Sequence, residues 1–114
     1  MSNARQDLSG RDLRGCDLSG CDLSGANLRG TILEWADLSG CNLSGANLRG
    51  ARLEGARLEG ANLTGADLSY STLTYSTLTD ANLSGANLSR ADLYGASAED
   101  ADFTGANLTG AALK

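Results

Sequence analysis

Acidic residues, arginines and serines are the side chains of this 114-residue chain whose chemistry could serve a function. The sequence contains no histidine, so the most common general base and catalytic metal ligand are both missing. Its many serines have no base at hand that could activate a hydroxyl as a nucleophile. The three cysteines lack the paired spacing of a metal site. We therefore predict that the protein is not an enzyme and uses no cofactor or metal.

The charged residues give the chain an acidic balance. Fourteen acids and nine basic residues produce a net charge of −5 and a pI of about 4.4. This balance argues against direct binding of nucleic acid, because the phosphate backbone would be repelled. Acids gather toward the N-terminus, and we treat five of them as a candidate acidic surface: Asp7, Asp12, Asp17, Asp22 and Asp37.

A strict repeat must position all of these side chains. Every fifth residue from Leu8 to Leu113 is leucine, except Ala98 and Phe103, and all 15 glycines lie two residues after this position. A helix would scatter such leucines around its axis, and a straight strand would turn successive ones to opposite faces. The spacing fits a chain that turns a corner after each unit, with the leucine and the small residue two before it pointing inward. Repeated units of this kind predict a β-solenoid.

The repeated unit closely resembles that of the pentapeptide-repeat proteins, as in Ala46-Asn47-Leu48-Arg49-Gly50. The resemblance covers residues 6–114 and implies an all-β fold, a right-handed quadrilateral parallel β-helix of about 5.5 coils with four pentapeptides per coil. Residues 21–30 recur at 41–50 with one Asp-to-Asn change, and this offset of 20 residues fits four units per coil. We expect one domain, residues 6–114, after a non-repeating segment at residues 1–5 that resembles a tag remnant.

The inward small positions include the three cysteines, which we expect to be buried thiols in place of alanine. A disulfide between Cys21 and Cys41 is an alternative, because a 20-residue step would place them on successive coils. Thiols, the lack of a leader and the lack of a long apolar run predict a cytoplasmic protein without a membrane partner. At the leucine position we expect the large Phe103 to fill the space left by Ala98.

One side of the predicted coil differs from the others. Sorted by a 20-residue step, the side centred on Leu63 carries mainly Asn, Ser and Thr, whereas the side centred on Leu33 gathers every Trp and Tyr of the chain. Aromatic residues and arginine are enriched at binding hot spots. The candidate partner-binding residues are Ile32, Trp35, Tyr70, Tyr75, Arg90 and Tyr94. The alternative is that Trp35, Tyr70 and Tyr75 only replace corner glycines in a different type of turn.

These features predict a non-catalytic structural or protein-interaction scaffold. The resemblance adds a second hypothesis, because some pentapeptide-repeat proteins mimic B-form DNA and bind the type II topoisomerase gyrase. A third hypothesis is a designed or consensus-derived repeat without a natural partner, which the near-perfect register would also fit. An open coil end would expose unpaired backbone groups, so self-association through that end is a further expectation.

Overall fold

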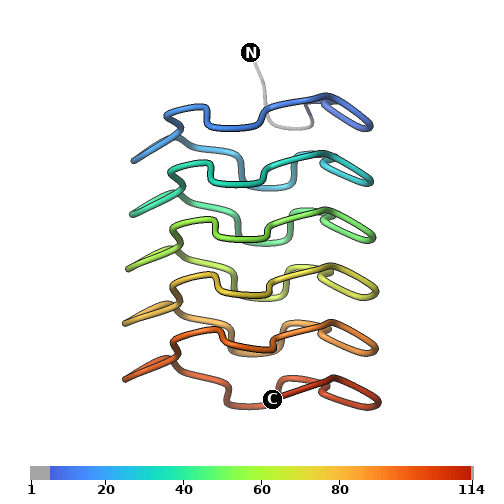
Figure 1. Ribbon diagram of the computed structural model, residues 1–114, viewed down its shortest axis with the longest axis vertical. Helices are drawn as coiled ribbons and strands as arrows, with labels where there is room; N and C mark the ends of the chain where they lie inside the picture. The colour runs from blue at the N-terminus through green and yellow to red at the C-terminus, as the bar shows by residue number, and fades with distance from the viewer. Residues whose placement is uncertain (1–5, 114) are drawn as a thin grey trace.

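The protein forms a coil of parallel β-bridges, seen in a computed structural model that describes residues 6–113 (Figure 1). Each bridge joins a residue to the one 20 positions later, so the strand elements are single bridging residues and not longer strands. The predicted β-helix is confirmed, whereas the number of coils stays a prediction. The expected non-repeating segment, residues 1–5, lies outside the described residues.

The bridges form four columns, which we call faces 1 to 4. Face 1 runs from Asp7 to Asn107, face 2 from Asp12 to Ala112, face 3 from Asp17 to Ser97, and face 4 from Asp22 to Asp102. A corner follows each face, and we name it by the two faces that it joins. Corners recur every 20 residues, starting from residues 9–10 (corner 1–2), 14–15 (corner 2–3), 19–20 (corner 3–4) and 24–25 (corner 4–1).

The corners need a left-handed backbone. Gly30, for example, has a φ of 68°, a region in which a Cβ clashes with the following carbonyl. The Gly30 N–H donates a hydrogen bond to the Arg49 carbonyl of the next coil (3.0 Å), and the Thr31 N–H closes the turn on the Leu28 carbonyl (3.2 Å). This geometry explains why glycine occupies most of these corner positions.

Where the bridging residue is Asp or Asn, its side chain secures the turn that follows it. The Asn27 Oδ1 accepts a hydrogen bond from the Arg29 N–H (3.1 Å). The Asp22 Oδ1 accepts from both the N–H (3.1 Å) and the hydroxyl (2.7 Å) of Ser24. These are Asx-turns, which both Asp and Asn can form. The requirement for this acceptor explains the Asp or Asn of the repeated unit.

Leucines fill the interior, and those from Leu28 to Leu88 are fully buried. Where serine replaces the small inward alanine, its hydroxyl finds a local acceptor, as in the bond from Ser71 to the Leu68 carbonyl (2.6 Å). All three cysteines are free thiols, so the alternative disulfide is not formed. Cys41 is buried, and this burial raises the pKa of its thiol to about 12.

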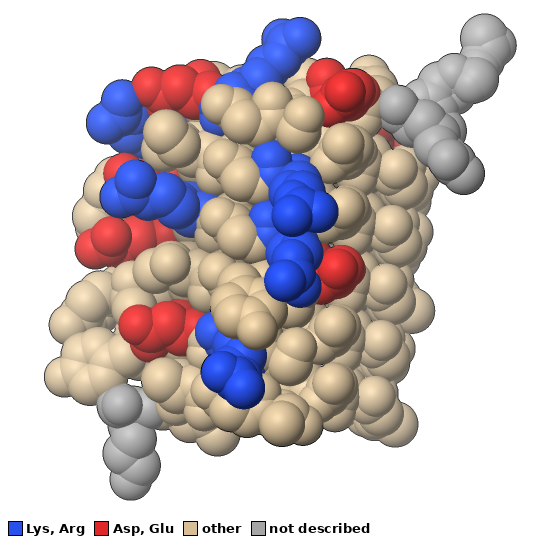
Figure 2. Space-filling view, turned by 90° about the vertical axis from the view of Figure 1, so that its right-hand side faces the viewer, with Lys and Arg blue, Asp and Glu red and all other residues tan. Residues whose placement is uncertain are grey.

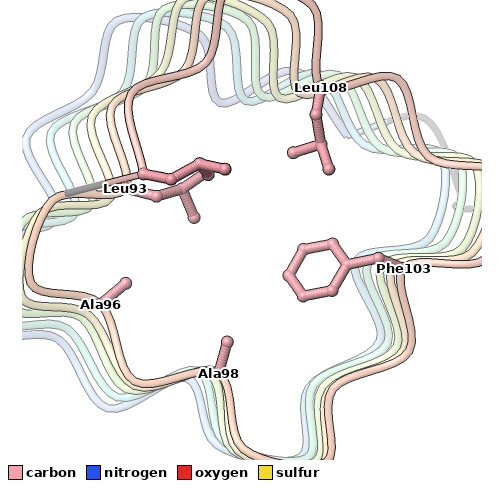
Figure 3. Close-up of a pocket in the computed structure, with 6 residues that line it drawn as sticks. Leu93, Ala96, Ala98, Phe103 and Leu108 are labelled. Carbon is pink, nitrogen blue, oxygen red and sulfur yellow. The ribbon is translucent and has the colours of Figure 1, made fainter.

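The last described coil is less buried than the middle coils. A partly open hollow of about 290 Å³ lies there, lined by Leu93, Ala96, Ala98, Phe103, Leu108 and Leu113 (Figure 3). The Phe103 ring points from face 4 toward the middle of the coil, and Phe103 and Ala98 both line the hollow. The expectation that Phe103 fills the space left by Ala98 stays a prediction.

Candidate protein-interaction surface

The structure places every predicted partner-binding residue on face 2 or at one of its two corners. Ile32 is the bridging residue of face 2 and is half-buried. Corner 2–3 carries Trp35, Tyr75 and Tyr94, and corner 1–2 carries Tyr70 and Arg90. Each of the four aromatic side chains is about half exposed or more, with Trp35 reaching 66%. Face 2 thus has an aromatic group along both of its edges.

Three of these aromatic residues have an unfavourable backbone conformation. The φ angles are 62° for Trp35, 61° for Tyr70 and 60° for Tyr75, close to those of the corner glycines. The alternative that they form a different type of turn is therefore wrong, because they enter the same left-handed turn. For a residue with a side chain this conformation costs about 1–2 kcal/mol. The backbone conformation at these three positions therefore favours glycine over the large side chains that occupy them.

The rings at corner 2–3 pack along the axis of the coil. A Cβ added to Gly55 would overlap the Trp35 ring, and a Cβ added to Gly95 would lie 2.6 Å from Cδ1 of Tyr75. The glycine one coil later therefore makes room for each ring. Tyr75 also meets Tyr94 edge-on, with ring centres 5.7 Å apart and planes at 89°. These contacts fix the rings while much of their surface stays exposed.

Corner 1–2 holds a second, separate group. The guanidinium of Arg49 lies 4.5 Å from the centre of the Tyr70 ring, a cation–π contact. Its Nη1 also donates a hydrogen bond to the Ser69 Oγ (3.0 Å). Arg49 was not among the predicted site residues. The 20-residue step could have found it, since this step places Arg49 above Ser69 and next to Tyr70.

Arginines concentrate on the same side of the molecule. Figure 2 shows basic side chains in a column down the middle of the view and in a second group at its upper left. Of the arginines that the structure describes, six lie on face 2 or its two corners: Arg11, Arg14, Arg29, Arg49, Arg52 and Arg90. Only four of the 14 acids lie there: Asp12, Glu34, Glu54 and Asp92. The other ten acids share the rest of the described surface with one arginine, Arg57, so charge is separated across the molecule.

Ion pairs neutralise only part of this charge. Arg14 pairs with Asp12 (2.6 Å), and Arg52 pairs across coils with Glu34 (3.0 Å). Away from this side, Arg57 lies 3.5 Å from Glu59. All three arginines are more than half exposed, so each pair adds little to stability. The pairs show which arginines have an acidic partner, namely Arg14, Arg52 and Arg57, and the other described arginines form no ion pair.

The five acids of the candidate acidic surface encircle the N-terminal end. Asp7 lies on face 1, Asp12 on face 2, Asp17 and Asp37 on face 3, and Asp22 on face 4. Hydrogen bonds from the serine two residues later hold the pKa of four of these carboxyls below the usual value, and Arg14 does the same for Asp12. They therefore remain charged at neutral pH while securing their turns.

A metal-binding cluster and a membrane-spanning helix are both absent from the described residues. Among residues 6–113, no cluster of three or more Cys, Asp and Glu side chains could hold a metal ion. Within the same part of the chain, no helix has the length and apolar character to cross a bilayer. The arginine- and aromatic-bearing side is thus the most distinctive surface of the described structure.

A four-faced β-helix with one differently decorated side defines a repeat protein of the solenoid class. The family model for pentapeptide repeats matches residues 7–45, 41–80 and 71–110, with 8 copies. The chain belongs to the pentapeptide-repeat family. The resemblance inferred from the repeated unit is confirmed.

Solved structures show the same fold. A pentapeptide repeat protein from the cyanobacterium Cyanothece 51142 superposes with a TM-score of 0.93 at 28% identity, covering 96% of this chain and 88% of that one. One from Nostoc PCC 7120 gives 0.56 at 36% identity, covering 91% and 85%. One from the thylakoid lumen of Arabidopsis thaliana gives 0.55 at 38% identity, covering 91% and 66%. Among curated proteins, no sequence matches this chain.

Proposed function

We propose that the protein is a non-catalytic scaffold that binds a protein partner through face 2 and its two corners. The observation that carries this proposal is the exposure of Trp35, Tyr70 and Tyr75 in a strained backbone conformation. Strain of this kind clusters at functional sites, where it is retained for a reason other than stability. Exposed aromatic rings beside arginines are also the residue types that dominate binding energy at protein interfaces.

The rigid placement of the rings supports the same proposal. Tyr75 is held by Tyr94 and lies over Gly95, while Trp35 lies over Gly55. Binding residues that are already ordered lose less entropy when a partner docks. A coil of parallel bridges also provides a stiff support, because each turn is hydrogen-bonded to the turns before and after it.

The test compares two double variants, each of which replaces two left-handed corner residues with glycine. Trp35→Gly with Tyr75→Gly removes two left-handed aromatic residues, whereas Asp80→Gly with Asp100→Gly removes two left-handed residues at corner 3–4. Both should fold, because glycine is the usual corner residue. In cross-linking from cells of the source organism, we expect the aromatic variant to lose partner proteins that the wild type and the Asp variant retain. Identical cross-linked partners for all three proteins would refute the proposal.

The separated charge favours a second candidate, the binding of a gyrase-like topoisomerase by mimicry of DNA. Ten acids against one arginine on the remaining described surface give it a negative potential. A gyrase supercoiling assay at two salt concentrations tests this candidate. Inhibition at micromolar protein that weakens with salt would support it, and no effect at a large molar excess would remove it.

A further inference from the structure

We propose that corner 1–2 binds an acidic, extended segment of the partner. This inference rests on the proposed function and names the chemistry that one edge of the surface recognises. The residues that carry it are Arg29, Arg49, Tyr70 and Arg90, which we call the arginine edge.

The residues of the arginine edge recur along the axis of the coil, and Figure 2 shows a column of basic side chains that uncharged side chains interrupt. Backbone hydrogen bonds join Gly30 to Arg49 (3.0 Å), Gly50 to Ser69 (2.9 Å) and Tyr70 to Ser89 (3.0 Å), so corner 1–2 occupies the same place in successive coils. Arg90 therefore lies about three coils from Arg29, or about 14 Å at the usual spacing between strands.

The arginines of this edge form no direct ion pair with the acids that the structure describes. Among residues 6–113, ion pairs involve Arg14, Arg52 and Arg57 but not Arg29, Arg49 or Arg90. Arg29 and Arg90 are exposed, and Arg49 is half-buried by its neighbours. An arginine that has no acidic partner in its own chain can form a charge-assisted hydrogen bond with an acid from another.

Two of the three arginines are held in place. Arg49 lies against the Tyr70 ring and donates to the Ser69 Oγ, and Ser69 is itself buried. The Arg90 side chain lies along the axis over Gly110, with its Cδ 3.0 Å from where a Cβ at Gly110 would be. Ordered guanidinium groups lose less side-chain entropy on binding than mobile ones do.

Carboxylates match the geometry of this edge. The planar guanidinium forms paired hydrogen bonds with a carboxylate, and Tyr70 offers an apolar contact between Arg49 and Arg90. An extended chain advances about 3.3 Å per residue, so about 14 Å accommodates about four residues. The partner segment is therefore a short extended run that carries at least two acids.

Charge favours a polypeptide over a nucleic acid as the occupant. The whole protein has a net charge of −5, and Asp67 lies on face 1 directly beside the edge. Nucleic-acid binding draws on many phosphate contacts, commonly about 6–10, and three arginines flanked by acids do not provide them. A short acidic peptide needs only the local charge of the edge.

The experiment measures the binding of fluorescein-labelled hexaglutamate by anisotropy at low salt, with hexaglutamine and single-stranded hexathymidylate as comparison probes. We expect hexaglutamate to bind more tightly than either. Arg29→Gln with Arg49→Gln should weaken hexaglutamate binding about tenfold, because two charge-assisted hydrogen-bonding groups are lost. Both variants keep the backbone N–H bonds to Asn27 and Asn47.

A matched control makes the same change in net charge elsewhere. Ser44→Glu with Thr64→Glu adds two negative charges at corner 4–1, where the backbone N–H groups bond to Asn42 and Asn62 in the same way. We expect this control to bind hexaglutamate within twofold of the wild type. An equal loss in the control would overturn the proposal, because it would show a response to total charge alone.

Two other results would also overturn it. If hexaglutamate does not bind, the proposal that the edge binds an acidic segment is refuted. If hexathymidylate binds more tightly than hexaglutamate, the edge prefers phosphate polymers to acidic peptides. The outcome is separable from the proposed function. If Trp35→Gly with Tyr75→Gly loses partner proteins while the arginine variant retains them all, the proposed partner-binding function is supported and the binding of an acidic segment is refuted. If the arginine variant loses the binding of hexaglutamate while the aromatic variant loses no partner protein, the proposed partner-binding function is refuted instead.

Discussion

Face 2 and face 4 share a backbone and a core but present different surfaces. Leu33 under face 2 and Leu43 under face 4 are both fully buried, and Trp35 and Gly45 have φ angles of 62° and 67°. Face 4 carries the amides of Asn42 and its neighbours, and its corners hold glycines together with the left-handed Asp80 and Asp100, whereas face 2 and its corners carry the strained aromatic residues and most of the described arginines. The coil keeps its register even where the outer position lacks the Asp or Asn that secures the turn, as at Ile32 and Arg52, so such positions are free to bind.

The first prediction checks that the core residues under the two faces contribute equally to stability. Leu33→Ala and Leu43→Ala should each lower the free energy of unfolding by about 3 kcal/mol, because each removes a fully buried side chain and leaves a cavity. Denaturant unfolding of both variants measures this. A difference above about 1.5 kcal/mol would show that the core under face 2 is also specialised.

The second prediction contrasts two corner glycines. Gly65→Ala should cost about 1 kcal/mol, since its φ is 67° but no atom lies within 4 Å of the new Cβ. Gly55→Ala should cost about 2 kcal/mol or more, because the new Cβ also overlaps the Trp35 ring. Adding Trp35→Gly should bring the cost of Gly55→Ala down to that of Gly65→Ala. Unfolding data without this rescue would contradict the packing of the ring over Gly55.

The third prediction compares left-handed residues at different corners. Asp80→Gly should raise the free energy of unfolding by about 0.5 kcal/mol, because relief of strain slightly exceeds the added entropy of the unfolded chain. Trp35→Gly should lower it by about 1 kcal/mol, since the burial of the ring against Gly55 is lost. Thermal unfolding of the two variants shows the difference in sign. Stabilisation of both would mean that the Trp35 ring contributes no packing.

The smallest effect concerns pH. Hydrogen bonds from serine hold the pKa of Asp17, Asp22 and Asp37 below the unfolded value of 3.8. Their stabilisation is therefore complete above about pH 4 and is lost as pH falls through the lowered values. Asn42 forms the same hydrogen bonds on face 4 without titrating. The variant with all three Asp→Asn changes should lose less melting temperature between pH 7 and pH 3 than the wild type, and an equal loss would refute this assignment.

The sequence was sufficient for the coil and for the location of the candidate surface, and insufficient for its contacts. Leucine and glycine at a fixed spacing specify what points inward and where the chain turns, as Leu28 and Gly30 show. The pairing of Arg52 with Glu34 could not be predicted, because Glu54 lies nearer in sequence and an exposed side chain can rotate toward either. The direction of the Trp35 ring depends on the neighbouring coil in the same way.

The 20-residue spacing of the bridges has a consequence for how such a chain can change by insertion and deletion. Gain or loss of 20 residues adds or removes one whole coil and leaves every later residue on its original side. Gain of a single pentapeptide after Gly50 would instead turn all later residues by a quarter of the circumference. Tyr70 and Arg90 would then leave the edge that holds Arg29 and Arg49, although the core would remain filled. Length changes that are harmless to the fold can therefore dismantle the surface, and only multiples of a full coil preserve both.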